Sequence, residues 1–258
     1  MDRKKKYINI IEPSVAMKSK PIETKLLETE CLFGETIEIL DEYSTWIYCR
    51  LLSDNYHGWI YKKSVGYLKQ PTHRVISIRT FLFTDQSEKS NYIHYLPLGA
   101  KLHVNNITND WAEICLSDKH SYQIAYVPYK HIVKLNNKIN DWVSVAEKLI
   151  GTPYKWGGKD TIGIDCSALV QLSYEAYGEI IPRNSIDQLR LPKKNIYNIK
   201  KLSRGFVVFW KGHVGIMVDK LHCIHANAYH MTTIVEPLKK IINRMNNENS
   251  IIKIMDFN

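Results

Sequence analysis

The stretch Asp165-Cys166-Ser167-Ala168-Leu169-Val170 decides the fold of the second half of this chain, because a cysteine there opens an apolar run of helical type. A thiol in the first turn of a helix lies at the positive end of the helix dipole, which favours the nucleophilic thiolate. Two histidines follow on predicted strands, in His213-Val214-Gly215-Ile216 and Ile224-His225-Ala226. The pattern predicts Cys166 as nucleophile, His213 as its general base and His225 as the group that orients the base.

The same region also contains the residue types of a zinc site, in His222-Cys223-Ile224-His225 with His230 nearby. Side chains alternate between the two faces of a strand, so His222 and His225 cannot chelate one ion together. Five cysteines form an odd number, which favours reduced thiols over a disulfide framework. We therefore expect no metal and no cofactor, and ordinary buried thiols at Cys31, Cys49, Cys115 and Cys223.

Further motifs surround Cys166. Gly151-Thr152-Pro153-Tyr154-Lys155-Trp156-Gly157-Gly158 precedes it, and Pro182-Arg183-Asn184-Ser185 follows it. With the cysteine and histidine motifs, the sequence resembles the NlpC-type peptidases, papain-like cysteine hydrolases that cut bacterial cell-wall peptides. The resemblance covers residues 140–240. The chain departs from the family pattern at Ala168, where the family usually has glycine, and at Ser203-Arg204-Gly205-Phe206-Val207, where it commonly has Pro-Gly-Asp-Leu.

The first half of the chain is of a different kind. Residues 20–135 predict short strands rich in Ile, Val, Tyr and Trp, separated by polar turns. A weak repeat relates residues 32–40 to residues 97–104. Gly34 corresponds to Gly99 and Trp46 to Trp111, and each pair is 65 positions apart (99 − 34 and 111 − 46). Two copies are too few for a solenoid. They predict two small β-barrels in tandem, which resemble the bacterial SH3-like domains that often precede NlpC-type domains.

These signals divide the chain into an SH3-like barrel at 1–70, a second one at 71–136, and a papain-like catalytic domain at 137–258. In the last domain we expect helices at 142–150, capped by Asp141, and at 166–177, ended by Gly178. Strands are expected at 206–210, 213–218, 221–226 and near 251–255. Helices followed by an antiparallel sheet make the fold class α+β.

The family resemblance implies an oxyanion-binding role for Tyr154, whose hydroxyl would act with the backbone amide of Cys166; the alternative is a structural tyrosine. It also implies that Asp165, Ser167 and Ser185 line the substrate site. In relatives that require a free N-terminal amine, the matching aspartate pairs with that ammonium, although Asp165 could instead only cap its helix. A tyrosine of the first SH3-like domain closes the same subsite, for which we choose Tyr56. The other candidates are Tyr61, Glu28 and Glu30.

Composition narrows the class of protein. The 258 residues are 45% hydrophobic, and no apolar run approaches the length of a membrane span. The basic start, Met1-Asp2-Arg3-Lys4-Lys5-Lys6, precedes an apolar segment too short for a signal peptide, so we expect a cytoplasmic protein without membrane association. The net charge of +9 could attract nucleic acid, but no basic cluster is interleaved with aromatic residues, so no such partner is expected. The oligomeric state is left open.

The resemblance implies cleavage after γ-D-glutamate in L-Ala-γ-D-Glu-diamino acid peptides, where the diamino acid is meso-diaminopimelate or L-lysine. The SH3-like domains would act as walls that admit only small murein peptides with a free L-Ala amine, as recycling of wall fragments requires. One alternative is a secreted wall hydrolase whose SH3-like domains bind the polymer. Another is a binding module with an inactive papain-like domain, which the presence of all three catalytic residue types disfavours.

Overall fold

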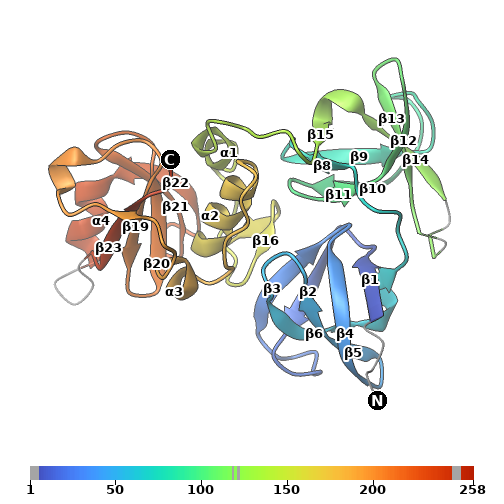
Figure 1. Cartoon of the computed structure of the whole chain (residues 1–258), viewed down its shortest axis with the longest axis horizontal. Helices are drawn as coiled ribbons and strands as arrows, with labels where there is room; N and C mark the ends of the chain where they lie inside the picture. The colour runs from blue at the N-terminus through green and yellow to red at the C-terminus, as the bar shows by residue number, and fades with distance from the viewer. Residues whose placement is uncertain (1–5, 118, 121–122, 246–250) are drawn as a thin grey trace. The chain divides into compact units, whose positions relative to one another are not determined.

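In the computed structural model, which describes residues 6–117, 119–120, 123–245 and 251–258, the chain divides into two units, 1–138 and 139–258 (Figure 1). The first unit consists of strands and short 3-10 turns, and the second combines helices with a sheet. The predicted α+β class of the second unit is confirmed. No helix within the described residues is long and apolar enough to span a membrane.

The first β-subdomain, strands β1 to β7, is an antiparallel sheet in the order β3-β2-β6-β5-β4-β1-β7. Apolar residues at alternate positions of β5 and β6 point into one core, because successive strand side chains point to opposite faces. Ile10, Ile37 and Ile60 are fully buried there. The elements are β1 (Lys6–Ile10), β2 (Ser14–Lys18), β3 (Leu27–Leu32), β4 (Thr36–Tyr43), β5 (Trp46–Leu51), β6 (His57–Tyr61), η1 (Lys62–Ser64) and β7 (Val65–Gly66).

The second β-subdomain, strands β8 to β15, contains two antiparallel sheets in the orders β10-β9-β14-β13-β12 and β11-β8-β15. The sequence repeat has a structural counterpart: Gly34 and Gly99 both have positive φ, and Trp46 and Trp111 both begin a strand. The elements are β8 (His73–Val75), β9 (Arg79–Phe83), β10 (Tyr92–Pro97), β11 (Lys101–Leu102), β12 (Val104–Thr108), β13 (Trp111–Cys115), β14 (Ile124–Pro128), η2 (Tyr129–His131) and β15 (Ile132–Lys134).

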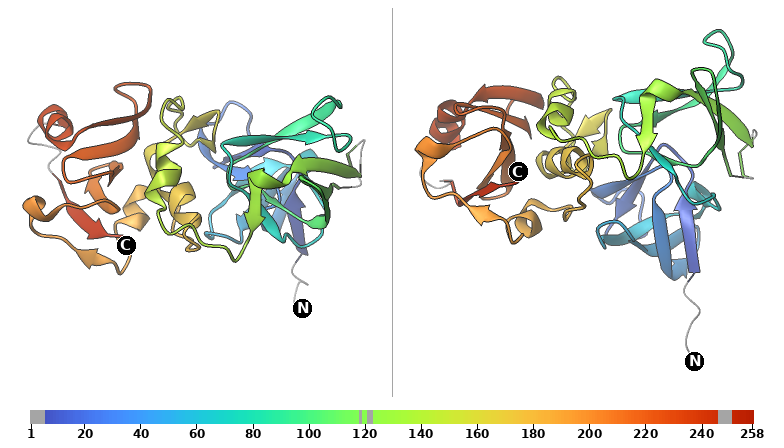
Figure 2. Two further views of the ribbon diagram at one scale, coloured as in Figure 1. Left: turned by 90° about the horizontal axis from the view of Figure 1, so that it is seen from above. Right: turned by 45° about the horizontal axis from the view of Figure 1, so that its top comes forward.

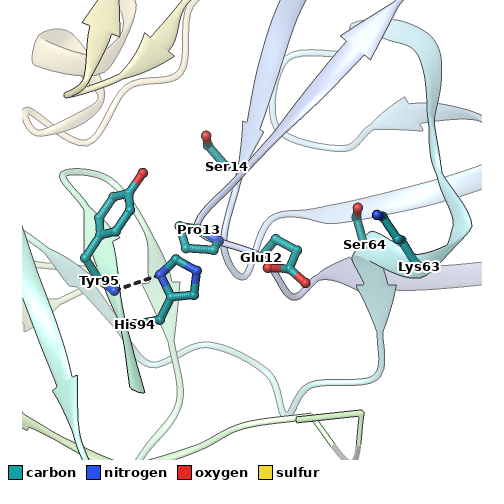
Figure 3. A pocket seen from close by; sticks show the side chains of 7 residues that line it. All are labelled: Glu12, Pro13, Ser14, Lys63, Ser64, His94 and Tyr95. Atoms are coloured by element: carbon teal, nitrogen blue, oxygen red, sulfur yellow. Dashed lines mark hydrogen bonds between the residues drawn. The ribbon is translucent and has the colours of Figure 1, made fainter. Parts of the chain in front are cut away.

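The two β-subdomains are joined by a close backbone contact. The N–H of Lys101 donates to the carbonyl of Phe33 at 2.8 Å, and the Phe33 side chain packs into the core of the second β-subdomain. A cavity of about 440 Å³ also lies between them (Figure 3). None of the residues predicted for catalysis or binding lines it. Its lining consists of Glu12, Pro13, Ser14, Lys63, Ser64, His94 and Tyr95.

In the second unit, helix α2 packs against strands β20 and β21 of a sheet in the order β18-β23-β19-β20-β21-β22 (Figure 2). Its elements are α1 (Val143–Glu147), β16 (Lys159–Asp160), β17 (Gly163–Ile164), α2 (Cys166–Glu175), α3 (Ser185–Gln188), β18 (Lys194–Asn195), η3 (Ile199–Lys201), β19 (Phe206–Trp210), β20 (His213–Met217), β21 (His222–Asn227), β22 (Thr232–Pro237), α4 (Leu238–Met245) and β23 (Lys253–Asp256).

Both predicted helices are shorter than expected, because their last turns tighten. After α1, the amides of Leu149 and Ile150 bond three residues back, and Gly151 follows with φ 84°. After α2, Tyr177 and Gly178 do the same, and Gly178 has φ 98°. The four predicted strands are present as β19, β20, β21 and β23. The longer elements without a counterpart in the sequence prediction are α3, β22 and α4; the short β16, β17, β18 and η3 were not predicted either.

Gly34→Ala tests the junction within the first unit. An added Cβ would lie 1.8 Å from the backbone oxygen of Lys101, and φ at Gly34 is 79°. Backbone strain and overpacking together should lower the free energy of unfolding by about 3 kcal/mol or more. Gly151→Ala is the matched control: φ there is also positive, at 84°, but nothing lies within 4 Å of the new Cβ, so about 1 kcal/mol is expected. Equal losses in urea unfolding would contradict this interpretation of the junction.

Candidate active site

Asp165 caps helix α2, directly before the predicted nucleophile. Its Oδ1 accepts the backbone N–H of Ala168 at 2.8 Å and the hydroxyl of Ser167 at 3.1 Å. Its Oδ2 accepts the N–H of Gly157 at 3.0 Å, which ties the preceding glycine loop to the helix. The alternative role that the sequence left open, that of a helix cap, is therefore present in the structure.

Arg183 pairs with this aspartate. The guanidinium is 2% exposed and donates to Oδ1 at 2.9 Å and to Oδ2 at 2.7 Å of Asp165. It also donates to Ser167 Oγ at 2.8 Å and to the carbonyl of Gly158 at 3.2 Å. A buried bidentate pair of this kind holds its partners in one geometry. Arg183 has no role in the sequence prediction, although its place in the Pro182-Arg183 motif was an available signal.

Cys166 begins α2 and is 7% exposed. Its sulfur accepts backbone hydrogen bonds from Val214, the second residue of β20, and from Ser167. Burial raises the pKa of the thiol to about 12, and the Asp165 carboxylate adds to the rise, against these hydrogen bonds and the charge of Arg183. The expected lowering of the thiol pKa by the helix terminus is therefore wrong, because desolvation outweighs the dipole.

His213 and His225 form a direct pair across neighbouring strands. Nε2 of His213 lies 2.7 Å from Nδ1 of His225, so the other ring nitrogen of His213, Nδ1, takes no part in this pair. His225 is 1% exposed, whereas His213 is partly exposed. Gly215, two residues after His213 on β20, has no room for a side chain: a Cβ there would lie 2.5 Å from Cys223 Sγ and 3.3 Å from His225 Cβ.

The electrostatics of the site favour a neutral resting state. Burial lowers the pKa of His213 to about 3, and the positive charge that His225 and Arg244 would place nearby acts in the same direction. A neutral imidazole can accept the proton of a neutral thiol as that thiol attacks an electrophile. The arrangement can therefore perform acyl transfer with Cys166 as nucleophile and His213 as base.

Tyr154 lies within electrostatic range of Cys166 and Asp165. Burial raises the pKa of its hydroxyl to about 12, and the charges of those two residues add to the rise. Its backbone is tied down, because Tyr154 N donates to the carbonyl of Met231 at 3.0 Å and the residue bridges to Ile164. The hydroxyl stays protonated at neutral pH and can donate a hydrogen bond.

The other residues predicted to bind substrate are Ser167, Ser185 and Tyr56, and each lies in a different environment. Ser167 is 7% exposed, and its hydroxyl is used between Asp165 and Arg183. Ser185 begins α3, which packs against α2, and is partly exposed. Tyr56 belongs to the other unit, where it packs against the core of the first β-subdomain. Its assignment to the substrate site rests on the family resemblance alone.

Besides Arg183, the sequence prediction assigned no role to Glu236 on β22 or to Arg244 on α4. Glu236 Oε1 lies 2.8 Å from His225 Nε2, and Arg244 donates to both carboxylate oxygens. Both lie on elements that the sequence did not predict. No group of three or more His, Cys, Asp or Glu side chains among the described residues is arranged to hold a metal ion.

Comparison with known proteins agrees with this geometry. Residues 151–249 match the NlpC/P60 family, and residues 20–65 match the bacterial dipeptidyl-peptidase Sh3 domain. The chain is 38% identical over 85 residues to dipeptidyl-peptidase 6 of Lysinibacillus sphaericus, a match that covers 33% of this chain and 31% of that protein. It is 25% identical over 225 residues to gamma-D-glutamyl-L-lysine dipeptidyl-peptidase of Bacillus subtilis, covering 78% of this chain and 72% of the relative.

A solved structure extends the comparison to the fold of the whole chain. The crystal structure of an NlpC/P60 family protein from Bacillus cereus has a TM-score of 0.83 at 17% identity, covering 98% of this chain and 99% of the other. At that identity the match demonstrates a shared fold, in which strand-rich domains precede the mixed helix and sheet domain.

Proposed function

We propose that the chain is a cysteine peptidase that acts on murein peptides. It carries a bacterial Sh3 domain at residues 20–65, followed along the sequence by an NlpC/P60 domain at residues 151–249. The bond cut is the one between γ-D-glutamate and the following diamino acid. The observation that carries the proposal is Cys166 at the start of α2, beside β20, with the His213–His225 pair joined at 2.7 Å. The name of the Bacillus subtilis relative supports the choice of bond.

In the proposed mechanism, Cys166 Sγ attacks the γ-D-glutamyl carbonyl carbon while His213 Nδ1 takes the thiol proton. The imidazolium then donates that proton to the amine of the diamino acid as the C–N bond breaks, which leaves a thioester. Water attacks the thioester with His213 again as base, and the released thiol recovers its proton. His225 holds the base through its hydrogen bond to Nε2.

The tetrahedral intermediate carries a negative oxygen that needs donors. We assign this role to the backbone N–H of Cys166, at the helix N-terminus, and to the hydroxyl of Tyr154. The raised pKa of Tyr154, about 12, comes from burial first and from the charges of Cys166 and Asp165 second. It supports the assignment, because a protonated phenol can donate to the oxyanion throughout the neutral range.

Substrate selection is proposed to depend on a free L-Ala amine. Asp165 keeps 12% of its side-chain surface exposed despite its pairing with Arg183, and we propose that the ammonium group approaches from that side. Ser185, partly exposed at the start of α3, would line the same subsite. A requirement for a free amine suits small soluble fragments, so we propose a role in cytoplasmic recycling of murein peptides.

The reaction and the nucleophile are tested together. Incubation of the full-length protein with L-Ala-γ-D-Glu-meso-diaminopimelate should release L-Ala-γ-D-Glu, detected by mass spectrometry, and the L-lysine tripeptide should be tried alongside. Cys166→Ala should abolish release while the melting temperature changes little, since a small residue at a helix start replaces another. An active Cys166→Ala protein would contradict the mechanism. Activity only on intact sacculi would favour the secreted wall hydrolase instead.

Amine recognition is tested by N-acetylating the L-Ala residue. Loss of a charge-assisted hydrogen bond, worth about 1.5–3 kcal/mol, should lower kcat/KM by at least about tenfold. If Tyr56 lines the subsite, Tyr56→Phe should reduce the difference in kcat/KM between the free and the acetylated peptide. Tyr61→Phe is the matched variant for the alternative candidate. Equal kcat/KM for the free and acetylated peptides would rule out the amine subsite.

The pKa of His213 predicts how kcat/KM depends on pH. Burial lowers the pKa of His213 to about 3 from an ordinary 6.5, so the neutral, proton-accepting imidazole persists as pH falls through 6 and 5. Activity that depends on this form is lost only as pH approaches the lowered pKa. The acid limb of kcat/KM for the tripeptide should therefore lie well below pH 6.5. An acid limb at or above pH 6.5 would contradict a lowered pKa at His213.

A further inference from the structure

The hydrogen-bonded pair of histidines does not end at His225. Beyond it, Glu236 Oε1 lies 2.8 Å from His225 Nε2, and the Glu236 residue is 7% exposed. Arg244 donates from Nη1 to Oε2 at 3.1 Å and from Nη2 to Oε1. A continuous row of contacts thus runs from α4 through β22 and β21 to the base on β20.

Strand register explains why these groups meet. Strands β21 and β22 pair Cys223 with Glu236 and His225 with Ile234. Opposite residues share a face of the sheet, and so do residues two apart along a strand. Glu236 is therefore the diagonal neighbour of His225 on the same face, within reach of its ring.

We propose that Glu236, held by Arg244, is a positioning residue that sets the direction of the hydrogen bonds between the two histidines. A carboxylate can only accept, so the Nε2 of His225 carries the proton and its Nδ1 accepts from His213 Nε2–H. The lone pair of His213 is then at Nδ1, the nitrogen left for Cys166. The inference rests on the proposed function, in which His213 takes the thiol proton.

The charge on Glu236 is maintained by its surroundings. Burial acts to raise the pKa of this carboxyl, but hydrogen bonds from Arg244 and His225 outweigh it and lower the pKa to about 2. Other titratable neighbours among the described residues are Cys223, His230 and Tyr229. Cys223 pairs with Glu236 across the strands, and burial and the Glu236 charge raise the pKa of its thiol. His230 Nε2 is 3.5 Å from Oε1, and the Tyr229 ring lies 4.4 Å from the Arg244 guanidinium. Glu236 therefore stays an acceptor throughout the pH range of the proposed reaction.

A competing group makes this role necessary. The side-chain nitrogen of Asn227 lies 3.2 Å from His225 Nε2, and its oxygen accepts the N–H of His230 at 2.9 Å. An amide donor at that position requires an unprotonated Nε2, which is the opposite tautomer. The charged carboxylate at 2.8 Å prevails over the longer amide contact. Without Glu236, Asn227 would donate to His225 Nε2, and each histidine would carry its proton on the other ring nitrogen.

Glu236→Ala and Glu236→Gln separate the acceptor from the charge. Glutamine can keep an oxygen at the Oε1 position, facing His225, so its kcat should stay within about fivefold of the native value. Alanine leaves Asn227 as the partner of His225. Its kcat should fall by at least about tenfold with KM nearly unchanged, toward the roughly 10⁴-fold loss that a wrong histidine tautomer causes in a serine-protease triad.

Two measurements need no substrate. In ¹⁵N-histidine NMR spectra, His225 should be protonated at Nε2 in the native protein and in Glu236→Gln, and at Nδ1 in Glu236→Ala. Alkylation of Cys166 by iodoacetamide should slow in Glu236→Ala alone, because a base protonated at Nδ1 cannot take the thiol proton. These two measurements decide the inference even if the native protein leaves the tripeptide intact, which would overturn only the proposed substrate.

Second-site variants control for a merely structural effect. Asn227→Asp in the Glu236→Ala background supplies a carboxylate beside Nε2 and should restore both the native tautomer and most of kcat. His230→Ala removes another neighbour of the Glu236 carboxylate that lies outside the row, and should leave kcat and the NMR signals unchanged. A Glu236→Ala protein with the native tautomer, or with kcat within twofold of the native value, would overturn the inference. So would failure of Asn227→Asp to rescue a variant whose melting temperature is native.

Discussion

The carboxylate of Asp165 joins three segments of the chain within residues 157–183. It accepts the N–H of Gly157 from the glycine loop, caps α2 through Ala168, and pairs with the buried guanidinium of Arg183. Removing either charge would leave the other buried without its partner, which is far more unfavourable than losing a surface ion pair. The position of the Cys166 backbone, and therefore of its sulfur, follows from this single buried cluster.

Burial determines the pKa shifts of Cys166 and His213, but not that of Glu236. At Cys166 and His213, desolvation dominates: it raises the pKa of the thiol to about 12 and lowers that of the imidazole to about 3, so both rest neutral. At Glu236, hydrogen bonds from Arg244 and His225 outweigh desolvation, and the pKa falls to about 2. A fixed negative charge at the Glu236 end of the row favours one direction of the hydrogen bonds between the two histidines, because a carboxylate can only accept.

Much of the site could be predicted from the sequence. The apolar helix after Cys166, the alternating strands that carry His213 and His225, and the two-residue turn between β19 and β20 are local patterns, and the structure has each of them. The end of α2 was placed within a few residues, since a tightened last turn is not visible in residue periodicity. Glu236 and Arg244 were missed because β22 and α4 went unpredicted, and with them the partner of His225.

The sequence by itself determined the residue types of the proposed nucleophile and base, their order along the chain, and the α+β class of the domain that holds them. Those properties follow from local periodicity and from the chemistry of single side chains. Only the tertiary structure decided the pKa of Cys166 and the partner of His225. Desolvation depends on every segment packed around a group, and a diagonal contact between β21 and β22 depends on their register. Neither can be read from neighbours along the chain.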